Sequence, residues 1–121
     1  MGERVAVLGA SDDPARMSNV ALHRLAAAGH TVLPVNPNSA RFEGEPVART
    51  LDELVPPVDT ITVYLRPELA EPLADAMIAA RPRRVIFNPG AESPRLKARL
   101  EAAGVRVQWD CTLVLLRTHR Y

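Results

Sequence analysis

At 121 residues the chain has room for one domain with a single hydrophobic core, and we expect residues 1–121 to fold as one unit. Its 15 basic residues are nearly balanced by 14 acidic ones, which argues against a general nucleic-acid binder. No apolar run approaches the roughly 18 residues of a membrane span, and the single cysteine, Cys111, excludes an internal disulfide and a multi-cysteine metal site. We therefore expect a cytoplasmic protein without a membrane segment.

The first predicted unit is a strand, a loop and a helix. Residues 5–8 are apolar and partly β-branched, which predicts a strand buried on both faces that ends at Gly9. Ser18 and Asn19 are favoured N-cap residues and predict a helix over residues 20–28. The loop would direct free backbone N–H groups and the positive end of the helix dipole at an anion. We expect a phosphate-bearing ligand there, although a tight strand–helix turn without a ligand fits the same pattern.

The remaining chain alternates strands and helices. Four further strands are predicted at residues 31–35, 60–65, 84–87 and 105–108, with a helical turn at 51–54 and helices over 67–80 and up to residue 103. Pro34 would cost a hydrogen bond in a central strand, so we place it where its missing N–H is not needed. In the middle helix, whose regular part is expected to begin near Glu71 because of Pro72, the predicted buried face consists of Leu69, Leu73, Ala76, Met77 and Ala80.

The C-terminal segment contains the apolar run 113–116, which is too apolar for a free tail. It predicts a last short helix or a covering segment, and it would equally suit a dimer interface.

Five strands separated by helices predict a Rossmann-like α/β domain with a doubly wound, five-stranded parallel sheet flanked by helices. Ligands of such sheets bind beyond the carboxyl ends of the strands. The candidate site therefore consists of the residues that follow the strands, with Arg16 as a cation near the first loop: Gly9, Ala10 and Ser11; Val35, Asn36 and Pro37; Leu65, Arg66 and Pro67; Asn88, Pro89 and Gly90.

Several other chemistries fit less well. A dinucleotide site would have a glycine-rich fingerprint and a carboxylate after the second strand, where this chain has Asn36 and Asn38. NAD(P) binding by an oxidoreductase component nevertheless stays open. The pair Asp12 and Asp13 resembles that of a phospho-receiver domain, but no aspartate follows the third strand. Cys111 and three scattered histidines form no catalytic pattern, so no catalytic or metal-binding residue is predicted.

Four short motifs, in order, carry a specific resemblance: residues 9–19, 34–37, 66–68 and 87–92. Together they resemble the small stand-alone CoA-binding domain proteins. The Rossmann-like domain of that family is similar to the N-terminal CoA-binding domain of the succinyl-CoA synthetase α subunit and of ADP-forming acyl-CoA synthetases.

The resemblance implies a pocket for coenzyme A. The pyrophosphate would lie over residues 9–11 near Arg16, Ser18 and Asn19, the adenosine by residues 35–37 facing residues 65–67, and the pantetheine arm along Asn88 and Gly90. The synthetases have Lys-x-Gly where this chain has residues 16–18, and the family's C-terminal segment differs from residues 110–117.

A chain of 121 residues has no room for the phosphohistidine and ATP-grasp domains of the synthetases. The hypothesis is therefore non-covalent binding of coenzyme A or acyl-CoA by a carrier, sensor or partner subunit without catalysis of its own, working as a homodimer or with a protein partner.

Overall fold

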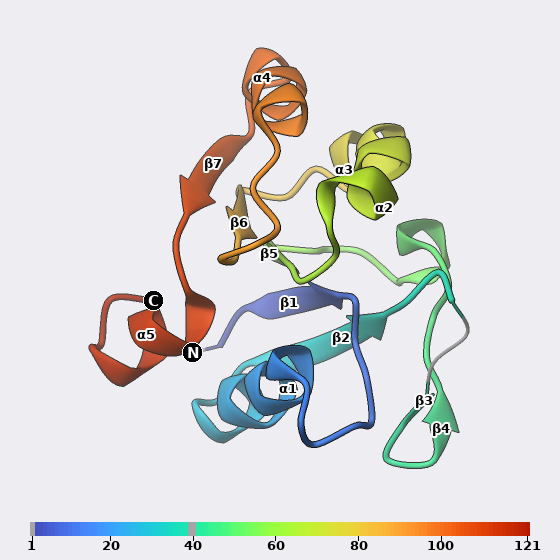
Figure 1. The fold of residues 1–121 in the computed structure, drawn as a ribbon, viewed down its shortest axis with the longest axis vertical. Coiled ribbons are helices and arrows are strands. Elements are labelled where there is room, and N and C mark those ends of the chain that lie inside the picture. The colour runs from blue at the N-terminus through green and yellow to red at the C-terminus, as the bar shows by residue number, and fades with distance from the viewer. Residues whose placement is uncertain (1, 39–40) are drawn as a thin grey trace.

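The fold is a single five-stranded parallel sheet flanked by helices, which confirms the predicted Rossmann-like α/β class (Figure 1). The computed structural model describes residues 2–38 and 41–121. The strand order is β2-β1-β5-β6-β7. The sheet strands are β1 (Arg4–Leu8), β2 (Thr31–Val35), β5 (Thr60–Val63), β6 (Arg84–Phe87) and β7 (Arg106–Trp109). The helices are α1 (Met17–Ala27), α2 (Pro67–Ala70), α3 (Ala74–Ala79), α4 (Pro94–Ala102) and α5 (Thr112–Arg117), with 3₁₀ turns at Leu51–Glu53 and Glu71–Leu73.

Helices cover both faces of the sheet. Alternate residues of β1 point to opposite sides: Val5 and Val7 pack in the cluster of α1 and α5, whereas Ala6 and Leu8 join the larger cluster of α3 and α4. Because both faces are covered, the central strands are almost entirely buried, as the apolar runs predicted. Pro34 lies in the edge strand β2, where a missing N–H is tolerated.

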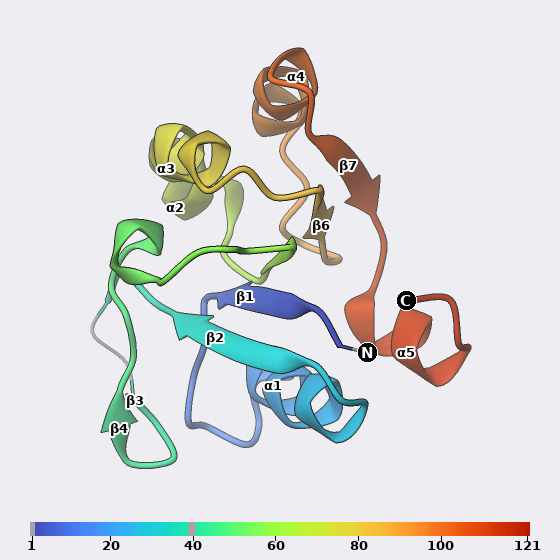
Figure 2. The same cartoon turned by 180° about the vertical axis from the view of Figure 1, so that it is seen from behind.

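The C-terminal segment forms α5, which packs on α1, so the predicted covering helix is confirmed (Figure 2). Leu115 is buried, and Leu113 and Leu116 pack against the α1 cluster. A homodimer stays a prediction. In the described part of the chain, no helix is both long and apolar enough to cross a membrane.

The start of α1 differs from the prediction. The helix begins at Met17, with Arg16 at the N-cap and no side-chain cap, so Ser18 and Asn19 lie inside the first turn. Both are buried, and the Asn19 amide donates to the Ser11 carbonyl at 2.9 Å. Asn19 therefore ties the loop to the helix by a contact that a local capping pattern does not reveal.

The connection between β5 and β6 is broken into three short helical pieces. Pro72 lies in the 3₁₀ turn that separates α2 from α3, because proline cannot continue a hydrogen-bonded helix interior. Met77 is buried as predicted, and Leu73 and Ala76 pack partly buried against the core. The break shifts the rest of the face, so Ala70 and Ala74 are buried instead of Leu69, which is exposed.

A short hairpin was not predicted. It consists of β3 (Arg41–Phe42) and β4 (Glu45–Pro46), and Glu43 and Gly44 turn it with positive φ angles. The Asp12 carboxylate accepts a hydrogen bond from the Glu43 N–H at 2.9 Å. The hairpin is therefore attached to the loop that follows β1. The third predicted sheet strand also ends earlier, at Val63.

Candidate functional site at the carboxyl ends of the strands

The loop after β1 is held by the end of β2. Gly9 has φ +101°, which favours glycine, and the N–H groups of Gly9 and Ala10 both donate to the Val35 carbonyl, at 2.8 and 3.1 Å. These two groups are therefore not free for a ligand, contrary to the expectation of an open loop. Within residues 2–38 and 41–121, the N–H groups of Met17 and Ser18 have no acceptor. The free donors thus belong to the first turn of α1.

Two cavities meet at this loop. One has a volume of about 560 Å³ and the other about 400 Å³, and both are lined by Gly9, Arg16 and Tyr64. The cavity of about 560 Å³ is also lined by Asn36, and we call it the Asn36 cavity. The cavity of about 400 Å³ is also lined by Asn88, and we call it the Asn88 cavity. Together they follow the carboxyl edge of the sheet from β2 to β7, which is where the strand order places a ligand.

The Asn36 cavity is polar and positively charged. Its charged side chains are Arg16 and Arg66, and no carboxylate lines it among the residues described. The Asn36 amide donates to the Ala10 carbonyl at 2.8 Å, and its oxygen accepts from the Asn38 N–H at 2.8 Å. Arg66 is largely exposed, and its Nε forms an ion pair with Glu68 Oε2 at 3.9 Å. An exposed pair of this kind is weak, so the guanidinium can exchange Glu68 for an anionic ligand.

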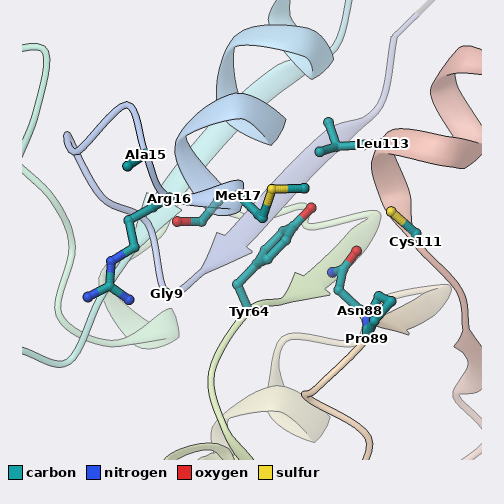
Figure 3. A pocket seen from close by; sticks show the side chains of 10 residues that line it. Gly9, Ala15, Arg16, Met17, Tyr64, Asn88, Pro89, Cys111 and Leu113 are labelled. Atoms are coloured by element: carbon teal, nitrogen blue, oxygen red, sulfur yellow. The ribbon is translucent and has the colours of Figure 1, made fainter.

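The Asn88 cavity has a mixed lining in which Met17, Pro89, Cys111 and Leu113 supply apolar or weakly polar surface (Figure 3). Asn88 is buried at its base.

The Asn88 side chain is fully used by the protein. Its Nδ2 donates to Thr62 Oγ1 at 2.7 Å and to the Val63 carbonyl at 2.9 Å, and its Oδ1 accepts from the Thr112 N–H at 2.8 Å. The hydroxyls of Thr62 and Thr112 also lie 2.8 Å apart. Asn88 therefore joins β5, β6 and the start of α5, and it shapes the cavity more than it offers a hydrogen bond to a ligand.

The structure brings most of the predicted site residues to this edge. The cavities are lined by Gly9, Ser11, Arg16, Ser18, Asn36, Leu65, Arg66 and Asn88. Ala10, Asn19, Pro37, Pro67 and Gly90 do not line either cavity in the described part of the chain. Val35 lines a third cavity, between the sheet and α3. Ala10, Asn19 and Val35 instead fix the loop through the contacts given above.

Several residues that line the cavities were not predicted as site residues: Ala15, Met17, Asn38, Tyr64, Leu69, Cys111 and Leu113. Tyr64 directly follows β5, and its N–H donates to the Leu8 carbonyl at 2.8 Å. The predicted strand over residues 60–65 contained Tyr64, so its place beyond the strand follows only from the end of β5 at Val63. Cys111 follows the last strand, which places it near the carboxyl edge from the sequence alone, whereas Leu113 could be placed only once α5 was known to fold back on α1.

The two tyrosines should remain protonated in moderately alkaline solution. Burial raises the pKa of Tyr64, Cys111 raises it further, and the nearby hydroxyls of Thr112 and Thr62 offset this rise only in part. Burial also raises the pKa of Tyr121, with a further rise from Glu3. Because the native state holds these protons more tightly than the unfolded state, their contribution to stability is present below about pH 10 and is lost as pH rises above it. Absorbance titration should detect no tyrosinate at about pH 10.5 until the protein unfolds. Half-ionisation of either phenol near pH 10 in the folded protein would contradict this.

Within residues 2–38 and 41–121, no three His, Cys, Asp or Glu side chains lie close enough together to hold a metal ion.

Solved structures similar to this chain share its fold over nearly its whole length. The chain superposes on the crystal structure of an uncharacterised protein with a TM-score of 0.93 and 29% identity, covering 100% of this chain and 99% of the other. The protein cell-free ID.343 from Thermus thermophilus gives a TM-score of 0.88 and 30% identity, covering 99% and 91%. The dinucleotide-forming acetyl-coenzyme A synthetase 1 of Ca. Korarchaeum cryptofilum shares the fold, with a TM-score of 0.74 and 20% identity, over 89% of this chain but 25% of the synthetase.

Sequence comparison assigns the family. The protein YneT of Bacillus subtilis, described as uncharacterised, is 32% identical over 76 residues, which span 63% of this chain and 56% of YneT. The family model described as CoA binding domain matches residues 3–117. The chain therefore belongs to the CoA binding domain family.

Proposed function

We propose that this protein binds coenzyme A or an acyl-CoA non-covalently across the two cavities. The observation that carries the proposal is that a charged cavity and a mostly uncharged one meet at Gly9, Tyr64 and Arg16, the residue directly before α1. Coenzyme A has the same order of parts: a phosphorylated adenosine, a pyrophosphate and a long, uncharged pantetheine arm.

The pyrophosphate would lie at the start of α1. The free N–H groups of Met17 and Ser18 and the positive end of the helix dipole favour an anion there. Arg16 lines both cavities, so its side chain could pair with the pyrophosphate from either side.

The adenosine and its 3′-phosphate would occupy the Asn36 cavity. Arg66 supplies a cation there, and Asn36 and Asn38 stand where an NAD site has a carboxylate. A carboxylate would repel the 3′-phosphate, whereas its replacement by amides leaves the cavity favourable to a second anionic group.

The role would be that of a carrier, a sensor or a partner subunit without catalysis of its own. Ligase chemistry is not carried over, because the chain corresponds to only 25% of the synthetase whose fold it shares. A homodimer or a protein partner would supply the further function.

Calorimetric titration tests the proposal directly. After bound nucleotide has been sought by mass spectrometry and removed, we expect coenzyme A and acetyl-CoA to bind with Kd of about 1 μM or lower, equivalent to about 8 kcal/mol, and NAD and NADP to bind far more weakly. Binding of NAD or NADP alone, or of none of the four ligands, would overturn the proposal.

The Arg66→Ala variant refines the same titration. We expect it to weaken coenzyme A about tenfold and dephospho-CoA hardly at all, because the second ligand lacks the 3′-phosphate. Arg106→Ala is the matched control, since Arg106 is exposed at the opposite end of the strands. An equal loss for both ligands would assign Arg66 to another part of the ligand.

A further inference from the structure

The hydroxyl of Tyr64 has an unusual position at the junction of the two cavities. The side chain lines both cavities, yet the hydroxyl oxygen is buried and has no hydrogen-bond partner within residues 2–38 and 41–121. In Figure 3 the phenol points toward the part of the Asn88 cavity that Met17 and Leu113 line.

The surrounding polar groups are already paired with one another. The Thr62 and Thr112 hydroxyls share a hydrogen bond, and Asn88 donates to Thr62 and accepts from the Thr112 N–H. The Tyr64 N–H donates to the Leu8 carbonyl, and this bond holds the backbone that carries the ring next to β1. The Thr62 and Thr112 hydroxyls lie near enough to the Tyr64 hydroxyl to lower its pKa in part, but among the described residues none has hydrogen-bond geometry with it, so it is left unpaired.

An unpaired buried hydroxyl costs about 1–3 kcal/mol, so a ligand that pairs with it gains that interaction. Burial raises the pKa of Tyr64, so the group keeps its proton and acts as a donor at neutral pH. It therefore lacks an acceptor. Met17 lies in the same cavity wall, is 56% exposed and has a flexible, unbranched side chain that can move aside when a ligand enters.

We propose that the Tyr64 hydroxyl donates a hydrogen bond to a carbonyl oxygen in the part of the ligand that lies beyond the pyrophosphate. In coenzyme A this acceptor is a pantetheine amide, and in an acyl-CoA the thioester carbonyl is a second source. The inference rests on the proposed function and adds to it a residue that recognises the arm of the ligand and not its nucleotide.

The Asn88 cavity suits the arm because its charged lining is limited, among the described residues, to Arg16. The remaining side chains that line it are polar without charge or apolar, and an arm that alternates methylene groups with amides needs both. The Asn36 cavity, with two arginines, suits the phosphorylated nucleoside instead.

Titration of Tyr64→Phe tests the inference with three ligands: coenzyme A, acetyl-CoA and adenosine 3′,5′-bisphosphate, which lacks the arm. We expect about a tenfold loss for coenzyme A and acetyl-CoA and no change for the bisphosphate. An equal loss for both arm-bearing ligands assigns the acceptor to a pantetheine amide, and a loss confined to acetyl-CoA assigns it to the thioester. Unchanged affinity for both, or an equal loss for all three ligands, would overturn the inference.

Tyr121→Phe is a matched control. Tyr121 also has a buried hydroxyl without a partner among the described residues, but it lies at the opposite end of the sheet, where Arg84 stacks on its ring at 4.4 Å. Its replacement should leave all three affinities unchanged. Neither variant should melt below the original protein, since each removes only an unpaired hydroxyl.

The bisphosphate separates failure of this inference from failure of the proposed function. If the bisphosphate binds the original protein and Tyr64→Phe with equal affinity, and coenzyme A does so too, the nucleotide site is supported and the role of Tyr64 is wrong. If none of the three ligands binds the original protein, the proposed function is wrong and the inference falls with it.

Discussion

Replacement of Gly9 by alanine is expected to weaken coenzyme A binding about a hundredfold, equivalent to about 2.7 kcal/mol. Gly9 lies in the wall of both cavities and adopts φ +101°. A Cβ atom there would lie 3.2 Å from Leu65 Cδ2 and 3.3 Å from the carbonyl carbon of Tyr64. Since Leu65 and Tyr64 also line the cavities, the added methyl group would displace the walls of the site itself.

The substitution also strains the loop. An alanine at a left-handed φ costs roughly 1–2 kcal/mol more than glycine. Relaxation of that strain would disturb the bonds from Gly9 and Ala10 to Val35, which join the loop to β2. We therefore expect a loss of stability together with the larger loss of affinity.

Gly104→Ala controls for the backbone effect. Gly104 has φ +87°, but no atom lies within 4 Å of the position of its Cβ, and it follows α4 far from the cavities. Thermal unfolding should show a moderate loss of stability for both variants, whereas calorimetry should show a loss of coenzyme A affinity for Gly9→Ala alone. Equal coenzyme A affinities for the two variants would show that the loop after β1 is not part of the binding site.

Replacement of Asn88 by leucine is expected to lower the free energy of unfolding by about 3 kcal/mol and Tm by about 10 °C. Leucine has the same branched side-chain skeleton as asparagine but can neither accept from the Thr112 N–H nor donate to Thr62. The buried Thr112 N–H would then have no partner, at the point where α5 leaves the sheet. Cys111 and Leu113, which flank it, line the Asn88 cavity.

Thermal and denaturant unfolding measure this effect, with Asn38→Leu as the control. Asn38 is exposed, so its replacement should change stability by no more than about 0.5 kcal/mol. A similarly small change for Asn88→Leu would show that the buried network contributes little, and that Asn88 is free to serve a ligand as the sequence analysis expected.

The sequence by itself determined the five strands, their separation by helices and the edge of the sheet that carries the site. These features depend on local patterns: apolar runs for buried strands, glycines where strands and helices end, and a fixed handedness of crossover. The parallel topology then placed the residues after each strand together. Asn36, Arg66 and Asn88 were assigned to one edge for that reason, and all three line its cavities.

Only the tertiary structure decided which atoms of that edge are free. Ser18 and Asn19 have the residue types of an N-cap, but both are buried inside the first turn of α1. The free backbone donors are the N–H groups of Met17 and Ser18 in that turn, and not those of Gly9 and Ala10 in the loop. In the same way, the Asn88 amide is used within the protein while the Tyr64 hydroxyl is left without a partner. The hydrogen bonds behind these assignments join residues that are not sequence neighbours: Asn19 bonds to Ser11, 8 positions away, and Asn88 bonds to Thr62 and Thr112, 26 and 24 positions away. A local pattern specifies a residue's strand or helix, but it does not specify which distant groups pair with its side chain.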